Sequence, residues 1–347
     1  MAFLSRLLHS TFIIKLRSWE YWPFGIIQAP LFPYWLWLSL RARSLIYWSA
    51  SNPGIVMGGM FGESKFDVLE KIPEVYKPKA VLVRVPALAE QVKRQIEQIG
   101  IGFPLIFKPD LGERGWMVKK ISNPSELENY LAQIKIDFIA QEFVDLPLEF
   151  GVFYVRYPSE QFGRVTSIAG KEMLSVVGDG IKTLRELILK TDRAKLQWKT
   201  LSTTYKDDLE RVIPLGERRE LVSIGNHCLG TRFLNANHLI TEKLTASFER
   251  ISKQIEGFYF GRFDLRVASL EDLENGKIMI MELNGCGAEP AHIYQSGFSL
   301  TKACGVLIRH WSDIYRVSRE NHERGVAYLS FREARKIYRN FKTLTSS

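Results

Sequence analysis

A charged face on an otherwise apolar hairpin is the strongest constraint that this sequence places on its fold. Two strand-like runs between residues 258 and 285, FYFGRFDLRVAS and KIMIMELNG, flank the turn-rich segment LEDLENG. If they pair as an antiparallel hairpin centred near Leu273, Asp264 lies opposite Glu282. In the same register Arg262 lies opposite Asn284, and period-two alternation puts all four on one face. The other face is predicted to line the core and carries Phe263, Leu265, Met281 and Leu283.

The polar face of this hairpin has the composition of a metal site. Two carboxylates directly across a ladder repel each other unless a cation lies between them. Asp264, Glu282 and Asn284 together offer only oxygen donors, which suit the hard ion Mg²⁺. Arg262 is placed to hold a phosphoryl or acyl-phosphate oxygen beside the metal. The alternative is a solvated polar strand face with an Arg–Asp pair.

A second group of candidates precedes the hairpin. Lys108 ends a predicted strand and is followed by LGERGWMV, where Gly112 and Gly115 loosen a turn. Such a turn can lay backbone N–H groups over phosphates, with the lysine as a point charge. An ordinary glycine-containing hairpin is the alternative. Further on come an AQEFV strand edge, Glu149 and the isolated cation Lys171, each of which taken singly is also compatible with a surface residue.

The remaining pattern predicts an α+β fold. Short strands and helices follow one another without the regular βαβ alternation of a Rossmann sheet. Strands are predicted at 103–107, 116–121, 138–144, 150–157 and 164–177, and helices at 87–99, 123–134, 183–190, 239–256 and most of 299–340. Residues 51–85 are predicted to be loop and short helix, and residues 191–219 are polar and poorly patterned.

The order of these features resembles the ATP-grasp superfamily, most closely D-alanine–D-alanine ligase-like and cyanophycin-synthetase-like members. The resemblance covers about residues 100–300. In order, the matching features are a strand that ends in a lysine, a glycine loop, the segment QEFV-x4-E, a second lysine, and the hairpin that carries Arg-Asp on one strand and Glu-Asn on the other. The resemblance implies two α+β subdomains that clamp a nucleotide, and the composition adds an aromatic-rich amino-terminal segment before them.

The resemblance also implies roles for individual residues. Arg262 resembles the phosphate-clamping arginine, which makes it the candidate catalytic residue. ATP is implied as a cofactor with two Mg²⁺ ions, for which Mn²⁺ is expected to substitute. Metal ligands are then Asp264, Glu282 and Asn284, and nucleotide-binding residues are Lys108, Gly112, Gly115, Gln141, Glu142, Val144, Glu149 and Lys171. In this set Val144 offers backbone contacts to adenine, Glu149 binds ribose, and Gln141 stands where an acid is common.

The function implied is that of an ATP-dependent carboxylate–amine ligase. A small or peptide-like carboxylate becomes an acyl phosphate, and an amine then displaces phosphate. A non-catalytic, membrane-surface-associated protein that binds MgATP is the alternative. Glu289, His292 and Tyr294 follow the metal strand and either face the acceptor substrate or simply form loop structure. Cys286 is not needed as a nucleophile in this chemistry.

The expected domains follow from the same resemblance. A tryptophan-rich segment and a short preceding region occupy residues 1–85, and the ATP-grasp domain occupies residues 86–320. Within that domain the nucleotide clamp spans about 103–180 and the metal and substrate lobe about 181–320, and a helical tail follows over 321–347.

The amino-terminal segment has a composition of its own. Five of the eight tryptophans lie in the first fifty residues, and no charged residue occurs from Tyr21 to Leu40. Three prolines within that stretch exclude a continuous membrane-spanning helix, because each removes a backbone donor. Two interpretations stay open: an arm packed against the main body, or a membrane-interface segment over residues 19–48 with arginines facing anionic lipid.

The overall composition limits the classes of binding partner that are expected. The net charge of +9 favours anionic partners such as ATP, anionic substrates or lipid. No basic run with interleaved aromatics occurs, so no nucleic acid is expected. Three cysteines without paired spacing fit a reducing compartment, and we expect a cytoplasmic protein, with peripheral contact at the inner face of the membrane and a homodimer both left open.

Overall fold

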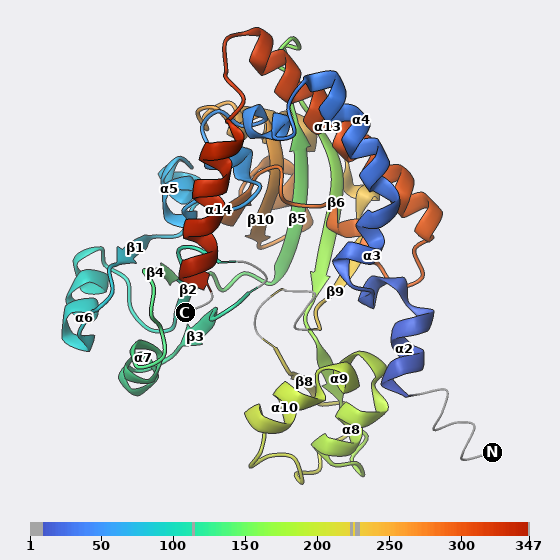
Figure 1. Ribbon diagram of the computed structural model, residues 1–347. Helices are drawn as coiled ribbons and strands as arrows, with labels where there is room; N and C mark the ends of the chain where they lie inside the picture. Colours follow the sequence, from blue (N-terminus) through green and yellow to red (C-terminus); the bar gives the residue numbers. More distant parts are fainter. Residues whose placement is uncertain (1–9, 113–114, 223–224, 226–229, 346–347) are drawn as a thin grey trace.

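A five-stranded antiparallel sheet forms the centre of the molecule (Figure 1). The computed structural model describes residues 10–345 apart from 113–114, 223–224 and 226–229. In sheet order the strands are β11 (Met279–Asn284), β10 (Phe260–Val267), β5 (Leu148–Val155), β6 (Arg164–Glu172) and β9 (Arg232–Asn235). Every neighbouring pair is antiparallel, which confirms the predicted α+β class.

Both faces of this central sheet are covered by helices. On one face α11 (Glu242–Ser252) and α12 (Leu270–Asn275) bury Val152, Phe263 and Leu265. On the opposite face α13 (Leu300–Glu323) packs over Phe153 and Phe260. Since Arg262 is the cross-strand partner of Phe153, the predicted polar cluster lies on the face that α13 covers, further along the strands.

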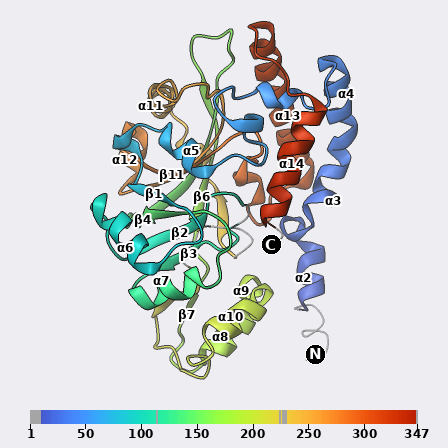
Figure 2. The ribbon, with the colours of Figure 1, turned by 60° about the vertical axis from the view of Figure 1, so that its left-hand side comes forward.

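A second antiparallel sheet lies beside the first (Figure 2). Its order is β1 (Ala80–Val83), β4 (Phe138–Glu142), β2 (Leu105–Pro109) and β3 (Lys119–Ile121). Two helices, α6 (Ala89–Gln98) and α7 (Pro124–Leu131), cover it and share its core. Asn123 caps α7 by accepting from the Glu126 N–H at 3.0 Å, so this helix begins where the sequence predicts.

A small helical unit extends from the central sheet. It contains β7 (Ser175–Val177) paired with β8 (Arg218–Glu220), and the helices α8 (Leu184–Lys190), α9 (Asp192–Leu196) and α10 (Trp198–Thr204). These elements share a core of their own. The prediction of poor patterning over residues 191–219 was wrong in part, because two short helices bury Ala194 and Leu201 there.

Helices from both ends of the chain complete the fold. Near the amino end are α2 (Thr11–Arg17), α3 (Phe24–Gln28), α4 (Phe32–Ala42) and α5 (Lys65–Glu70), and near the carboxyl end α14 (Phe331–Thr345). Short 3₁₀ helices are Trp19–Tyr21, Ala29–Leu31, Tyr47–Ala50, Val56–Gly59, Glu74–Tyr76, Asn237–Leu239 and Ala291–Tyr294. In the parts of the chain that the structure describes, no helix is both long and apolar enough to cross a bilayer.

The predicted hairpin forms in the predicted register. Asp264 pairs with Glu282 and Arg262 with Asn284. Two details differ: the connection is the helix α12 rather than a tight turn, and a bulge follows Asp264, where Leu265 pairs with Ile280. The bulge makes Met281 the extra residue, so Met281 is only partly buried and the prediction of a core position for it was wrong. The strand predicted at 116–121 is also shorter, and spans Lys119–Ile121.

Asn52 holds the loop that precedes the second sheet against the start of β10. It is fully buried, and its Oδ1 accepts from the N–H groups of Tyr259 and Phe260 at 2.9 Å each. Its Nδ2 donates to the carbonyls of Gly58 at 2.9 Å and Phe260 at 2.8 Å. One side chain therefore satisfies four backbone groups, most of them buried.

Replacing Asn52 is expected to destabilise the whole fold. Asn52→Ala should lower the free energy of unfolding by about 2–4 kcal/mol, because it leaves several buried backbone groups unpaired. Urea unfolding followed by circular dichroism measures this. Asn340→Ala, on the exposed side of α14, is the matched control and should change stability by less than about 0.5 kcal/mol. Equal effects of the two variants would contradict the assignment.

Candidate active site

Three neighbouring strands place alternating charges in a row. Glu149 on β5 is the cross-strand partner of Arg266 on β10 and of Lys171 on β6. Its carboxylate lies 3.0 Å from the guanidinium of Arg266 and 3.0 Å from Nζ of Lys171. All three side chains are largely buried, so each charge depends on its neighbours for compensation.

Asp264 extends this row toward the hairpin. Lys171 reaches its Oδ1 at 2.9 Å, and Arg262 donates to its Oδ2 at 3.0 Å. The amide of Asn284 also donates to Oδ2, at 2.8 Å. Burial alone would raise the pKa of Asp264, but Arg262 and Lys171 outweigh it and lower the pKa to about 2. Asp264 is therefore a carboxylate under all ordinary conditions.

A glycine makes room for this cluster. Gly151 on β5 is the cross-strand partner of Asp264. A Cβ atom at this position would lie 3.2 Å from Cδ of Arg262 and 3.3 Å from Oδ1 of Asp264. Gly151 thus leaves open the space that the arginine and the carboxylate occupy.

The second sheet contributes a buried lysine to the same region. Lys108, near the end of β2, donates to the carbonyl of Met281 at 3.0 Å. Gln141 on β4 donates to the same carbonyl at 3.3 Å. The acceptor belongs to the bulge residue of β11, so the bulge joins the two sheets beside Glu282. Burial lowers the pKa of Lys108 to about 8, although Glu282 nearby favours the charged form.

A further lysine, Lys65, comes from the start of α5. Its Nζ lies 3.6 Å from Oε1 of Glu282 and donates to the carbonyl of Gly112 at 2.5 Å. The neighbouring residues Ser64 and Phe66 both donate to Oδ1 of Asp110, at 2.8 and 2.9 Å. Asp110 therefore holds the residues on both sides of Lys65 in place, and Lys65 connects the glycine turn to β11.

The predicted glycine turn lies beside these lysines. Gly112 has φ of +144° and Gly115 has φ of +75°, a region that favours glycine. The residues between them, Glu113 and Arg114, lie outside the described residues, so the structure does not describe this part of the predicted phosphate loop.

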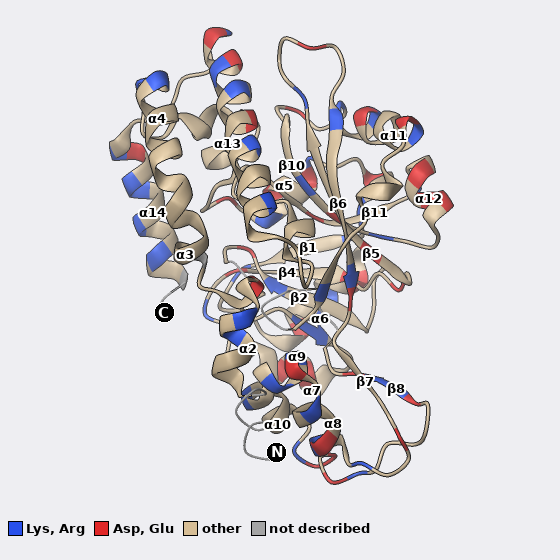
Figure 3. Cartoon of the chain, turned by 90° about the vertical axis from the view of Figure 1, so that its right-hand side faces the viewer, with Lys and Arg blue, Asp and Glu red and all other residues tan. Residues whose placement is uncertain are grey.

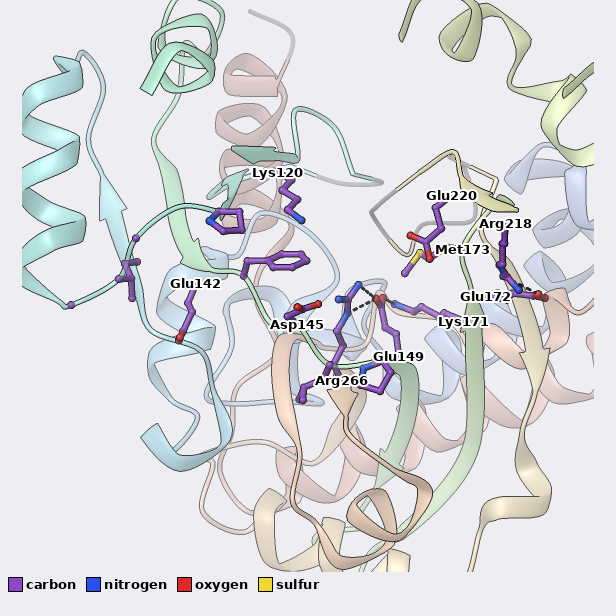
Figure 4. Close-up of a pocket in the computed structure, with 17 residues that line it drawn as sticks. Lys120, Glu142, Asp145, Glu149, Lys171, Glu172, Met173, Arg218, Glu220 and Arg266 are labelled. Carbon is purple, nitrogen blue, oxygen red and sulfur yellow. Dashed lines mark hydrogen bonds and ion pairs between the residues drawn. The ribbon is translucent and has the colours of Figure 1, made fainter. Parts of the chain in front are cut away.

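A cavity of about 790 Å³ opens next to the charged row (Figure 4). Its walls come from the linker after β4, the start of β5, the end of β6, and β3, β8 and β10. Arg266, Glu149 and Lys171 line its inner end, while Phe143 and Lys120 line another side, with Nζ of Lys120 3.8 Å from the ring centroid. The cavity therefore combines an aromatic surface with polar groups that lead toward Asp264.

The other predicted nucleotide-binding residues are not all turned toward this cavity. Glu142 lines it, and its carboxylate accepts from the N–H of Lys79 at 3.2 Å. Val144 offers its carbonyl to Arg266 at 2.9 Å. Gln141 instead points to the hairpin, as its bond to Met281 shows. Their roles toward a nucleotide stay predictions.

The predicted metal ligands fit a hard cation by donor type. Asp264 and Glu282 face each other across the ladder with Asn284 beside them, an oxygen-only set. In the ligand-free chain, protein cations neutralise both carboxylates: Lys171 and Arg262 at Asp264, and Lys65 at Glu282. Among the described residues, the hairpin included, no group of three or more His, Cys, Asp or Glu side chains could hold a metal ion, so the set needs the amide of Asn284.

The loop after β11 meets the same cluster. Arg262 donates to the carbonyl of Glu289 at 3.0 Å, and the carboxylate of Glu289 accepts from Gln28 and Tyr294. His292 is buried against Phe298, and burial lowers its pKa to about 4, so it belongs to the interior. Burial likewise raises the pKa of the Cys286 thiol to about 12, which agrees with a structural rather than nucleophilic role.

Two residues of the cluster were missed by the sequence interpretation. Arg266 follows Arg262 and Asp264 at the same spacing of two, so strand alternation could have placed it on this face. Lys65 gives no comparable signal, because tertiary packing of α5 against β11 brings it to Glu282.

The pH dependence of ATP binding should report on Lys108. Its pKa near 8 means that the side chain loses its proton as the pH rises past that value, whereas bound phosphates would restore the charge. The groups around it are Glu282, Lys65, Asp264 and Asp110. At about pH 9, ATP binding should therefore take up a proton. Calorimetry in two buffers of different ionisation enthalpy measures this uptake.

Lys108→Met is expected to abolish most of that proton uptake. Lys277→Gln, whose side chain is 76% exposed, is the control and should retain it. Identical binding heats for the wild type in both buffers would show that Lys108 does not titrate with ATP.

Lys65 is expected to contribute to nucleotide affinity through the glycine turn. Lys65→Gln removes both its charge and its bond to Gly112, so Kd for MgATP should rise about tenfold, equivalent to about 1.4 kcal/mol. Lys65→Arg should restore part of the affinity, because it keeps the charge. Titration calorimetry measures all three proteins, and an unchanged Kd in Lys65→Gln would exclude this role.

Comparison with known proteins finds likeness only among solved structures. The sequence matches no protein-family model and no curated protein. VanG D-Ala:D-Ser ligase from Enterococcus faecalis is similar with 14% identity and a TM-score of 0.42, over 74% of this chain and 62% of the ligase chain. The chain therefore spans less than two thirds of that ligase.

Two other similar solved structures are D-alanine–D-alanine ligases. The order of motifs in the sequence also resembles members of this group. The ligase from Bacillus anthracis has 14% identity and a TM-score of 0.42, over 78% of this chain and 72% of the ligase. The ligase from Coxiella burnetii has 10% identity and a TM-score of 0.42, over 83% of this chain and 62% of the ligase.

Proposed function

We propose that this protein is an ATP-dependent ligase that activates a carboxylate as an acyl phosphate and joins it to an amine. The observation that carries the proposal is the convergence of basic and acidic groups from both sheets on one face. Arg262, Asp264, Glu282 and Asn284 share that face of the hairpin. Lysines from three other elements, Lys65, Lys108 and Lys171, surround it.

This distribution of charge suits phosphoryl transfer. The transferred group carries negative charge on its equatorial oxygens, and catalysis consists largely of neutralising and positioning it. Lys108 and Lys171 would orient the phosphates, and Arg262 would stabilise the charge that develops on the transferred group. Asp264, Glu282 and Asn284 would hold Mg²⁺, which supplies further neutralisation of phosphate charge when it is bound.

The cavity beside the charged row suits the nucleoside. Its volume of about 790 Å³ lies within the range of about 300–1,000 Å³ that is usual for small-molecule sites. Phe143 would offer a ring face for a base, and Glu149 would offer carboxylate oxygens to ribose hydroxyls. A nucleotide placed this way would have its phosphates at Lys171 and the hairpin.

The proposed reaction has two steps, and the bonds formed and broken balance in each. A carboxylate oxygen of the substrate forms a bond to the γ-phosphorus of ATP, and the bond to ADP breaks. The amine nitrogen then attacks the carbonyl carbon of the acyl phosphate, inorganic phosphate leaves with the electron pair, and the amine proton passes to solvent. The loop from Gly285 to Tyr294 follows the metal strand and is proposed to line the acceptor, since Arg262 contacts Glu289 there.

Binding and turnover test the proposal in one set of variants. We expect wild-type protein to bind ATP with a Kd in the micromolar range that requires Mg²⁺. Glu282→Gln should weaken this binding at least about tenfold, because it removes one charged metal ligand. Titration calorimetry gives the affinity, and release of ADP in a screen of carboxylate and amine pools gives the turnover.

The control variant is Glu271→Gln, an exposed position on α12 away from the polar face. It should bind and turn over as the wild type does. Tight MgATP binding without ADP release from any pool would favour the non-catalytic alternative. No ATP binding by folded wild-type protein would refute the proposal.

A further inference from the structure

The amino-terminal helices α3 and α4 expose a set of uncharged, largely apolar residues. Between Tyr21 and Leu40 the chain has no charged residue. On α4 the apolar residues Phe32, Leu36 and Leu40, spaced by four, are 59%, 39% and 69% exposed. We call the exposed residues of this stretch the arm surface; with described side chains they are Pro23, Ile26, Ala29, Pro30, Phe32, Pro33, Leu36, Trp37 and Leu40.

The opposite side of the same helices is fixed to the body of the protein. Ile27, Leu31 and Leu38 are buried, the first two against α13 and the loop before it. The indole of Trp19 donates to the carbonyl of Phe298 at 2.6 Å. The interpretation as an arm packed on the main body is thus confirmed for this side, and the arm surface is held facing outward.

Basic residues border the arm surface at both ends. Lys15 and Arg17 lie on α2, and the Trp22 indole, which donates to the Lys15 carbonyl at 3.0 Å, holds that end close. Arg41 and Arg43 follow Leu40, and α4 is otherwise without charge (Figure 3). All four are exposed.

Residues 10–50 contain no exposed acidic side chain that could pair with these four basic residues. The one acid in this range, Glu20, is buried and pairs with Arg193 of α9 at 2.6 Å. An apolar surface with exposed tryptophan and exposed cations at both ends is complementary to a bilayer surface that carries negative headgroups.

We propose that the arm surface binds the surface of an anionic lipid bilayer. Phe32, Leu36 and Leu40 enter the boundary between headgroups and acyl chains, Trp37 lies at headgroup depth, and the basic ends contact lipid phosphates. The protein lies on the bilayer without crossing it. This inference is independent of the proposed reaction, because none of these residues belongs to the candidate active site.

A second copy of the chain is a less suitable occupant. In a symmetric dimer built on this surface, the same patch of both copies is paired. Since both ends of the patch are basic, either orientation of the two copies brings cations of one close to cations of the other. Lipid phosphates remove that repulsion.

Vesicle flotation with the full chain tests the proposal. Wild-type protein should float with vesicles of phosphatidylcholine and phosphatidylglycerol in equal parts, and the bound fraction should be several-fold lower with phosphatidylcholine alone. Phe32→Glu with Leu40→Glu should reduce binding to anionic vesicles at least about tenfold. Lys15→Gln with Arg17→Gln should reduce it mainly at low salt.

The matched control introduces two glutamates at exposed apolar positions outside the arm surface. Ile181→Glu with Leu215→Glu changes two residues that are 79% and 81% exposed near the β7–β8 pair, and should bind vesicles as the wild type does. Circular dichroism and thermal unfolding establish that all variants are folded. Wild-type protein that stays in the soluble fraction with both vesicle types overturns the proposal. So does a concentration-dependent dimer, lost in Phe32→Glu with Leu40→Glu, in place of vesicle binding.

Discussion

The site depends on one buried ionic arrangement, in which Lys171 bridges Glu149 and Asp264. Its Nζ lies 3.0 Å from one carboxylate and 2.9 Å from the other, and all three side chains are at most 8% exposed. Buried charges are tolerated only when they are paired, and removal of one partner from such a pair typically costs about 3–5 kcal/mol. The register of β10, β5 and β6 therefore cannot slip without stranding a charge, so the same ion pairs that hold the sheet also hold the cations of the site in place.

The second sheet contacts the site at a β-bulge in the first sheet. The bulge in β11 frees the carbonyl of Met281, which accepts from Lys108 and Gln141. Since β11 is the edge strand of the first sheet, its bulge residue can offer this carbonyl to the second sheet. Because of the bulge, a lysine from β2 lies beside Glu282, and Lys65 approaches from α5. The predicted phosphate end of the site thus exists only where the two sheets meet.

Much of this arrangement could be predicted from local sequence rules. Alternation along β10 and β11 was enough to pair Asp264 with Glu282, because a one-residue slip would have exposed Phe263 and Leu283. Helices were also predicted to begin at 123 and 183, and in the structure Asn123 and Thr183 cap α7 and α8 there. The bulge at Met281, the helices within residues 191–219 and the position of Lys65 could not be predicted. Lys65 reaches Glu282 through packing of α5 against β11, two elements far apart in the sequence. The bulge and the short helices are local features, but the residue pattern around them lacks a clear period.

We propose that the two sheets together hold a nucleotide with its phosphates at the hairpin. A crystal structure with Mg²⁺ and a non-hydrolysable ATP analogue tests it most directly. The account predicts the base against Phe143 in the cavity, phosphates between Lys108 and Lys171, and metal density on Asp264 and Glu282. Density for the analogue anywhere else, or metal density away from Asp264 and Glu282, would contradict it.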